Sequence, residues 1–305
     1  MMTTTVCKKC NKAIYGSYVQ ALGAYWHPEH FVCTHCRRPL GNSPIYEQQG
    51  MPYDAACYLE LFGKRCAYCG KPLNNWMYDQ WGTIFCEEHQ HQFPHCAYCG
   101  RLVSPQQQKT SMKDHENVRC PVCHSSAIET VADAEPIFSR LKQWIGSQGL
   151  RYNNLPIKLE LCNRAKLAQY LGGQTEQHSL GATMHVKYIQ NGQHIRTEVN
   201  GVAVVGGLPS TLFQGVTIHE LGHVWLATHG IEHLQPWQEE GFCELLAHRY
   251  YMHMNSTESL YHAQCIEKNP NRVYGDGFRR VRAIAERVGF VRLLEVLRTT
   301  KRMPN

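Results

Sequence analysis

The chain has 305 residues, of which 43% are hydrophobic and 18% charged, with a formal net charge of +6. This length and composition exclude a disordered or fibrous protein and allow two or three domains with buried cores. The first residues lack the apolar segment of a secretory signal, and no stretch approaches the roughly 18 apolar residues of a membrane span. We therefore expect a cytoplasmic protein without membrane contact.

The cysteines are unevenly distributed along the chain. Twelve of the fifteen precede residue 124, mostly as C-x-x-C pairs near histidines. An odd total arranged in this way indicates metal ligation in a reducing compartment rather than a disulfide framework. The other three, Cys162, Cys243 and Cys265, are expected to be buried core thiols.

Residues 1–62 carry two sets of four ligands in the order that zinc requires. A tetrahedral zinc takes four N or S donors, and two close pairs on tight turns supply them. Gaps of sixteen and seventeen residues separate the pairs, and two residues separate the sets. The predicted ligands are Cys7, Cys10, His27 and His30 for the first zinc, and Cys33, Cys36, Asp54 and Cys57 for the second.

The stretch "WHPEHFVC" at the junction of these sets resembles the central signature of the LIM domain. LIM domains usually place Cys first in the last pair and allow Asp second. Here Asp54 comes first and Cys57 second, so Asp54 departs from the family pattern.

Residues 63–127 repeat the arrangement with six residues between the two sets, which resembles a divergent LIM-like domain. The predicted ligands are Cys66, Cys69, Cys86 and His89, followed by Cys96, Cys99, Cys120 and Cys123. DNA-reading zinc fingers need about twelve residues and a recognition helix between their pairs. The sixteen-residue gap between Cys10 and His27, which contains most of "GSYVQALGAYWH", instead predicts short hairpins. We therefore expect four structural zincs and protein partners, and we do not expect nucleic-acid binding.

Residues 128–305 read as a mixed α and β domain that should fold alone. Helices are predicted over 133–149, 163–173 (capped by Asn163) and from about Ser210 to His229, with a strand at 156–162. Alternating residues on both sides of Asn191-Gly192 predict a hairpin. The stretch "EVNGVAVVGG" suits either an edge strand that binds substrate backbone or an internal strand.

The helix predicted near residue 219 carries "HELGH". His219 and His223 lie four residues apart, so both imidazoles project from one helix face towards a common metal ion. Glu220 is placed beside them to act as the general base. Because the chain has 18 histidines, such a motif can arise by chance, and a metal site also requires a third ligand from a following helix.

Glu240, seventeen residues after His223, precedes Gly241 in "PWQEEGFCELL". This resembles the gluzincin metallopeptidases, in which a Glu-Gly on the next helix completes a His-His-Glu site. The resemblance implies that Glu240 is the third ligand and that Glu244 orients a ligand histidine. It makes Glu239 a surface residue.

Two further side chains are candidates near that site. His248 would lie in its surroundings, although a structural histidine fits equally well. Tyr274 in "VYGDGF" would stabilise the oxyanion, with an ordinary buried tyrosine as the alternative.

The order of parts, together with "GLPSTLFQGVTIHELGHVW", "EEGFCELLAHRYY" and "YGDGFR", resembles the DA1-type LIM peptidases. This resemblance implies an α+β fold with LIM-type modules followed by a zincin peptidase domain. It also implies a zinc-dependent endopeptidase with one catalytic and four structural zincs, in which Glu220 assists attack by a zinc-bound water. The LIM modules would recruit protein substrates or regulate access.

The alternative is a LIM adaptor with a non-catalytic zincin fold. The intact Glu220 favours the enzyme, because a pseudoenzyme is free to lose its general base. Plant members of the family carry ubiquitin-interacting helices ahead of the LIM domain, and ubiquitin activation is not carried over to this chain.

Overall fold

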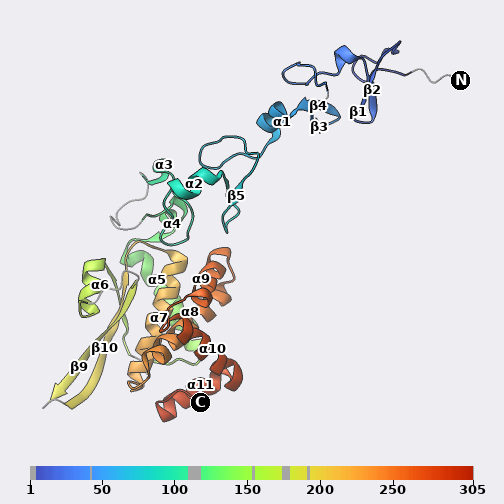
Figure 1. Cartoon of the computed structure of the whole chain (residues 1–305). Coiled ribbons are helices and arrows are strands. Elements are labelled where there is room, and N and C mark those ends of the chain that lie inside the picture. Colours follow the sequence, from blue (N-terminus) through green and yellow to red (C-terminus); the bar gives the residue numbers. More distant parts are fainter. Residues whose placement is uncertain are drawn as a thin grey trace. The chain divides into compact units, whose positions relative to one another are not determined.

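The computed structural model describes residues 5–41, 43–108, 118–152, 155–173, 179–190 and 193–304. The chain divides into two compact units, residues 1–94 and 95–305. Figure 1 identifies their helices and strands. The predicted class is confirmed: helices and strands are mixed, and Cys/His clusters accompany the short elements of the N-terminal half.

The first unit is built from short two-stranded hairpins and single helical turns. Its elements are β1 (Val19–Ala21), β2 (Ala24–Trp26), the 3₁₀ turn η1 (Pro28–His30), β3 (Ile45–Gln48), β4 (Met51–Asp54), α1 (Ala55–Phe62), β5 (Met77–Tyr78), β6 (Ile84–Phe85) and α2 (Glu87–Gln92). The antiparallel β1–β2 pair confirms the hairpin predicted between the first two ligand pairs.

Apolar packing in this unit is limited. One core cluster consists of Trp26, Phe31, Leu40 and the thiols Cys33 and Cys57. Such a core is small for a module of this size.

The second unit contains a three-stranded sheet in the order β8-β10-β9. These strands are β8 (Lys158–Cys162), β9 (Gly181–Gln190) and β10 (Gln193–Val205). β10 pairs parallel to β8 and antiparallel to β9, which confirms the predicted hairpin pairing. The turn at 191–192 lies outside the described residues.

β10 is therefore the central strand. Val202, Ala203 and Val204 are fully buried, as expected of a strand covered on both faces. The edge-strand interpretation of "EVNGVAVVGG" was wrong, and β9 lies at an edge of this sheet.

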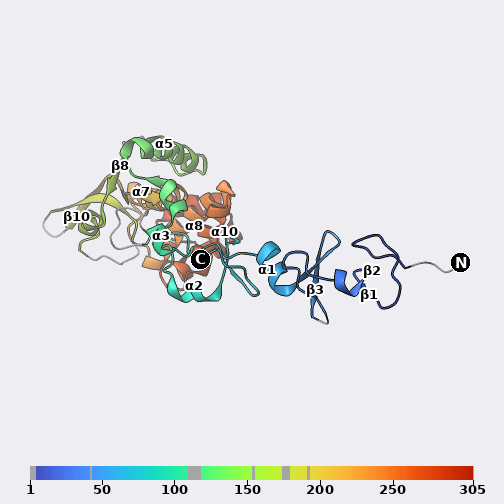
Figure 2. The ribbon, with the colours of Figure 1, turned by 90° about the horizontal axis from the view of Figure 1, so that it is seen from above.

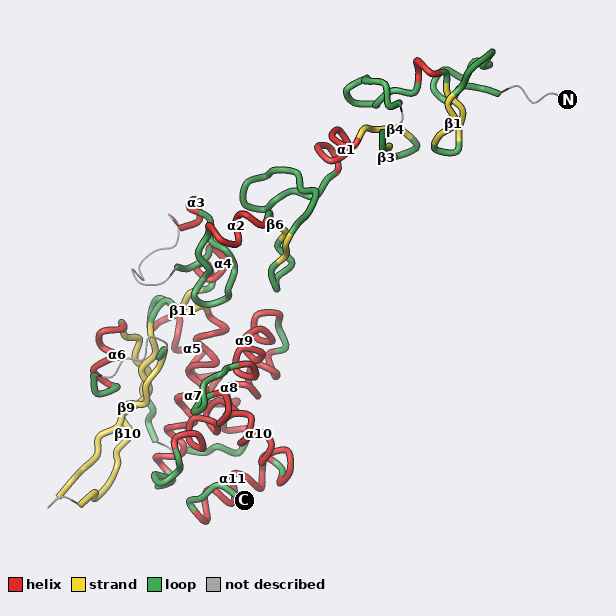
Figure 3. Tube along the Cα trace, in the orientation of Figure 1, coloured by secondary structure: helices red, strands yellow, loops and turns green. Residues whose placement is uncertain are grey.

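Helices form most of the second unit, and after β11 the described chain is almost entirely helical (Figure 3). The remaining elements are α3 (Pro105–Gln108), α4 (Pro121–Ser125), β7 (Ala127–Ile128), α5 (Val131–Ser147), α6 (Arg164–Tyr170), β11 (Leu208–Pro209), α7 (Ser210–Thr228), α8 (Pro236–Met254), α9 (Thr257–Lys268), α10 (Gly275–Val288) and α11 (Phe290–Thr300).

The start of α6 is as predicted: Asn163 Oδ1 accepts from Lys166 N at 2.8 Å. The helix predicted from Ser210 to His229 is α7, which ends one residue earlier. Among the described helices, none combines the length and apolar character needed to span a bilayer.

α7 lies in the middle of this unit. It packs against the sheet on one side and contacts α5 and α8, which flank it in the view from above (Figure 2). Phe213, Ile218, Leu221, Val224 and Trp225 are fully buried. An apolar residue on nearly every face of a helix is expected when neighbours surround it.

α8 and α10 cross very closely. A Cβ on Gly241 would lie 2.4 Å from the backbone carbonyl of Gly277, and a Cβ on Gly277 would lie 2.4 Å from the carbonyl oxygen of Trp237. Only glycine fits at both positions. This crossing fixes α8 at the residue next to Glu240.

Candidate metal centres and the cavity

Four sets of cysteine, histidine and aspartate side chains converge in the structure, and their members are those predicted from spacing. In each set the donor atoms lie within 4.8 Å of one another. The sets are Cys7, Cys10, His27 and His30; Cys33, Cys36, Asp54 and Cys57; Cys66, Cys69, Cys86 and His89; and Cys96, Cys99, Cys120 and Cys123.

The first set has the dimensions of a zinc site. Cys7 Sγ lies 3.5 Å from His30 Nδ1, Cys10 Sγ lies 3.5 Å from His27 Nδ1, and the two Nδ1 atoms are 3.3 Å apart. Bond lengths of 2.3 Å to sulfur and 2.0–2.1 Å to nitrogen give tetrahedral ligand separations of about 3.5 Å and 3.3 Å. The donors fit zinc.

Asp54 joins the second set despite its departure from the usual order. It is the N-cap of α1, where its Oδ1 accepts from Cys57 N at 2.8 Å. Its Oδ2 lies 3.0 Å from Cys36 Sγ. The bond from Cys36 and the Cys57 amide hold the pKa of this carboxyl below its ordinary value, so the ionised, metal-binding form is favoured.

The fourth set differs from the others in its surroundings. All four of its cysteines are buried, and Cys99 Sγ lies 3.6 Å from Cys120 Sγ. This set belongs to the second compact unit, with the C-terminal half of the chain. The division falls at Pro94 and His95, inside the predicted range 63–127.

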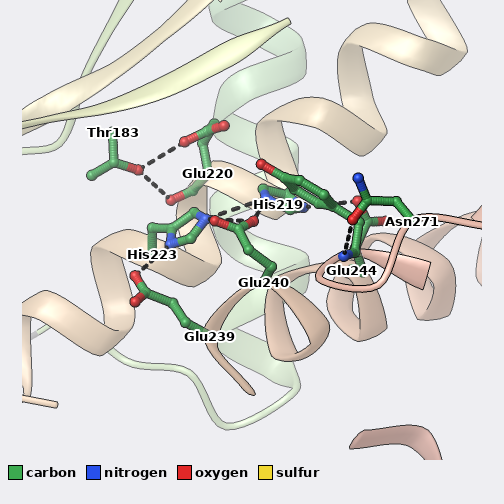
Figure 4. Close-up of polar contacts among 9 residues, drawn as sticks. Thr183, His219, Glu220, His223, Glu239, Glu240, Glu244 and Asn271 are labelled. Atoms are coloured by element: carbon green, nitrogen blue, oxygen red, sulfur yellow. Dashed lines mark hydrogen bonds and ion pairs between the residues drawn. The ribbon is translucent and has the colours of Figure 1, made fainter. Parts of the chain in front are cut away.

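A fifth group of donors lies between α7 and α8 (Figure 4). His219 Nε2 and His223 Nε2 are 3.2 Å apart, and Glu240 Oε2 lies 3.2 Å from the former and 3.5 Å from the latter. A tetrahedral zinc with nitrogen and oxygen ligands at 2.0–2.2 Å requires separations of about 3.3–3.5 Å. The three atoms thus form one face of such a tetrahedron.

The second nitrogens of both histidines face carboxylates. His219 Nδ1 lies 3.6 Å from Glu244 Oε1, and His223 Nδ1 lies 3.0 Å from Glu239 Oε1. Such contacts fix the tautomer and orientation of a ligand imidazole. Glu244 stands where the resemblance placed it, and burial raises its pKa.

Glu239 is not the simple surface residue that was expected. Its side chain is 41% exposed, yet it contacts His223. Consecutive helix residues differ by about 100° in direction. Glu240 can therefore face the Nε2 atoms of the two histidines while Glu239 contacts Nδ1 of His223. Burial opposes ionisation of Glu240, but both histidines hydrogen bond to it and hold its pKa below the ordinary value.

Cys243 forms the back of this group. Its thiol is fully buried and lies within 4.8 Å of nitrogens of His219 and His223. Burial raises its pKa to about 12, so it stays protonated, and Glu240 is the better third donor. The prediction of buried thiols is confirmed for Cys243 and Cys162 but is wrong for Cys265, which is exposed. The position of Cys243 beside the histidines was not foreseen.

Glu220 faces the sheet and is 7% exposed. Thr183 Oγ1, on β9, lies 2.9 Å from Glu220 Oε2 and 3.0 Å from the Glu220 carbonyl oxygen, and donates to this residue. A Cβ on Gly181 would come within 2.8 Å of Glu220 Cγ and Oε1. The Thr183 hydroxyl therefore orients the carboxylate (Figure 4), and the absence of a side chain at Gly181 leaves room for it.

These groups line a cavity of about 990 Å³ in the second unit. Its walls come from the start of β9, from α7, α8 and α9, and from residues 269–274. Tyr274 lines it, with its ring centroid 6.5 Å from that of His219 and the two planes 29° apart. The tyrosine is thus close to the donor group.

The expected position of His248 near the donor group was wrong, and the alternative of a structural histidine fits the structure. It does not line the described cavity wall: its Nε2 lies 2.8 Å from Glu267 Oε1, and its ring packs on Phe278. Eight residues beyond Glu240, it is about 12 Å farther along α8. That distance places it among α9 and α10 instead of the donor group.

Comparison with known proteins relates both halves of the chain to described families. The LIM domain family matches residues 7–62, and the DA1-like family, described as Protein DA1, matches residues 173–263. Protein DA1 of Arabidopsis thaliana is 23% identical over 99% of this chain, and Protein DA1-related 1 of the same plant is 23% identical over 98%. LIM domain-containing protein HDR3 of Oryza sativa subsp. japonica is 25% identical over 80%. The two matched families and these relatives support the DA1-type family of LIM-domain proteins.

The chain spans 69%, 66% and 55% of the lengths of Protein DA1, Protein DA1-related 1 and the rice protein, so each relative has parts without a counterpart here. The DA1-like match includes β9, α7 and all the donors of the fifth group. Thr183, Glu239 and Gly181 are the site residues that sequence reasoning missed. Only Glu239 had a signal, because it is adjacent to a predicted ligand on a helix.

Proposed function

We propose that this DA1-type chain is a zinc-dependent endopeptidase. The observation that carries the proposal is the triangle of His219 Nε2, His223 Nε2 and Glu240 Oε2, with edges of 3.2–3.5 Å, beside the buried carboxylate of Glu220. Three protein donors with an open fourth position are typical of catalytic zinc, whereas structural zinc has four protein ligands. The large cavity supplies room for substrate.

His219, His223 and Glu240 would hold the catalytic zinc, and Glu244 and Glu239 would hold the two imidazoles in the required tautomer. Zinc in this position would polarise the scissile carbonyl and make water acidic enough to lose a proton near neutral pH. The other four sets would take one structural zinc each, five in total.

Glu220 would move the proton. Its carboxylate takes a proton from the attacking water and gives it to the amine that leaves when the peptide bond breaks. For this transfer one oxygen must stay aimed at the water. The bond from Thr183 to Oε2 fixes the carboxylate, and Gly181 leaves room for it.

Substrate would lie between the sheet and Tyr274. Gly181 to Thr183 belong to β9, an edge strand at which an extended peptide could add by main-chain hydrogen bonds. Tyr274, the residue before α10, lines the same cavity and would donate its hydroxyl to the developing oxyanion.

The first unit would bind proteins, because it contains the LIM domain. Tyr46 stacks on Tyr58 at 4.9 Å, and Tyr58 contacts Phe62 at 5.3 Å. Tyr46 and Phe62 are each 43% exposed. Exposed aromatic groups of this kind suit a protein interface. Recruitment of protein substrates in the cytoplasm, or control of access to the cavity, would follow.

A LIM adaptor with an inactive zincin fold remains the competing function, and the support given to Glu220 by Thr183 and Gly181 speaks against it. The test compares cells that contain the wild type with cells that contain Glu220→Gln, and identifies protein N-termini present only with the wild type. Glu135→Gln, an exposed carboxylate on α5, is the matched control. Equal zinc content and loss of the new N-termini in Glu220→Gln alone are expected. Identical N-termini in all three would favour the adaptor.

A further inference from the structure

Arg119, immediately before the cluster ligand Cys120, is buried with only 4% of its surface exposed. Its Nη1 donates to the carbonyl oxygen of Gly207 at 2.6 Å and to Glu129 Oε1 at 3.1 Å. Its Nη2 donates to His124 Nδ1 at 2.9 Å. A buried guanidinium is stable only when such acceptors are held in place, so these contacts tie three segments together.

Gly207 is shaped for this contact. Its φ is +83°, and a Cβ there would lie 3.1 Å from Arg119 Nη1 and 3.3 Å from Glu129 Oε2. Glycine is needed both for the left-handed backbone and for the close approach of the ion pair. Gly207 directly precedes β11, which leads into α7.

The beginning of α7 has no cap of its own. Pro209 occupies the N-cap position without a side-chain cap bond. Instead, Ser210 N donates to the carbonyl oxygen of Ser126 at 2.8 Å, and Gly207 N donates to that of Ile128 at 2.7 Å. β11 also pairs antiparallel with β7. Ser126 follows α4, which begins after Cys120 and contains Cys123. The acceptor for the first amide of α7 therefore comes from the segment that directly follows the last cysteine pair of the fourth cluster.

We propose that Arg119 is a positioning residue that, with the fourth cluster, fixes the start of α7 and thereby the orientation of its histidines. Helix residues separated by nine positions, as Ser210 and His219 are, lie about 13 Å apart along one rigid rod. A small tilt at the start of α7 displaces both imidazoles from Glu240, and displacements near 1 Å disable such sites. The fourth cluster thus belongs structurally to the candidate active site.

The test is made on the full-length chain with Arg119→Met, which keeps much of the side-chain volume but removes all three hydrogen bonds. Hydrogen exchange of residues 207–214 should accelerate about tenfold or more, because a charge-assisted buried contact is lost. Exchange in the second half of α8 should stay near that of the wild type. One zinc per chain should be released at lower chelator concentration, and Arg119→Lys should restore part of the protection.

Arg65→Met is the matched control, since Arg65 forms an exposed ion pair with Glu60 in the other unit. It should leave residues 207–214 unchanged. Unchanged exchange there in Arg119→Met would overturn the proposal, and so would equal acceleration throughout the second unit, which indicates general destabilisation. If Arg119→Met is insoluble, Glu129→Gln decides: acceleration confined to residues 207–214 supports the proposal, and its absence refutes it.

Peptide hydrolysis gives a third readout that rests on the proposed function, with kcat about tenfold lower and KM nearly unchanged in Arg119→Met. Hydrogen exchange and zinc retention do not depend on that function. An inactive wild type would refute the peptidase assignment alone, whereas unaltered exchange would refute the positioning role alone.

Discussion

The hydroxyl of Thr183 lies 2.9 Å from Glu220 Oε2, across the junction between β9 and α7. The two residues are 37 positions apart, and neither is a metal donor in the described triangle. The contact joins Thr183 to the carboxylate that we propose moves the proton. If that role is right, metal binding and proton transfer depend on different residues and can be separated by mutation.

Thr183→Val keeps the shape of the side chain and removes its hydroxyl. We expect kcat for a fluorogenic peptide to fall about tenfold with unchanged zinc content, because the carboxylate is no longer fixed. Thr183→Ser keeps the donor and should retain most activity. Equal activity in the valine variant would show that Glu220 needs no such support.

Glu239 and Glu240 should differ in their effect on zinc. Glu240→Gln removes a ligand and should release one zinc per chain at the lowest chelator concentration. Glu239→Gln should lower the affinity for the same zinc by roughly 10–100-fold, as loss of a hydrogen-bond partner of a ligand histidine does. Elemental analysis along a chelator series measures both, with Glu135→Gln as control. A larger loss in Glu239→Gln than in Glu240→Gln would exchange their roles.

Five zincs per chain are expected in protein purified without chelator. Cys66→Ser should bind one fewer and unfold locally in the first unit, because a zinc site is a large part of the folding free energy of such a module. Its catalytic zinc should be retained, since Cys66 lies in the other compact unit. A measured total near two would contradict the assignment of the second pair of clusters.

His262 should make the second unit sensitive to acid. Burial lowers its pKa to about 4, although Glu258 opposes the shift, and its ring stacks on Tyr251. The unfolded chain, with a His pKa near 6.5, binds a proton that the folded chain rejects, so stability falls as pH drops from about 6.5 to 4. The full effect is about 3 kcal/mol. His262→Phe keeps the stacking and should lose less thermal stability between pH 7.5 and 5; parallel Tm profiles would contradict this.

A fragment from His95 to Asn305 should be soluble and bind two zincs. A fragment from residue 128, the boundary expected from composition, lacks Arg119 and Ser126 and should leave the start of α7 without its cap. We expect it to be less stable, by an amount that thermal unfolding of the two fragments measures. Equal stability would restore the boundary near residue 127 and make the fourth cluster dispensable.

The features predicted from sequence were those with local spacing rules. The geometry of ligand pairs such as Cys7 and Cys10, and of histidines four apart on a helix, follows from their spacing in the sequence. All four structural sets converge as expected. Asn163 likewise predicted the start of α6 correctly, because its side chain caps that helix. Distances along the chain were short in each case, so chain geometry alone was sufficient.

The features missed depend on tertiary contacts. Thr183 meets Glu220 because a strand crosses a helix, and Arg119 meets Gly207 across 88 positions. His248 was misplaced because helical spacing gives direction around α8 but not which neighbour lies at that height. The choice between an edge and an internal position for β10 stayed open, because a strand's neighbours cannot be read from its own residues.

The contact between Ser126 and the start of α7 also predicts the order in which activity and bound metal are lost on heating or in denaturant. The metal donors come from consecutive helices and are at most 21 positions apart, whereas Thr183 reaches Glu220 across 37 positions and Ser126 reaches Ser210 across 84. Contacts that close longer loops carry a larger entropic cost. We therefore expect them to break first under mild denaturation. Partly unfolded molecules that have lost the Ser126 contact should hold the catalytic metal more weakly, and their activity should fall before the metal dissociates in the absence of chelator.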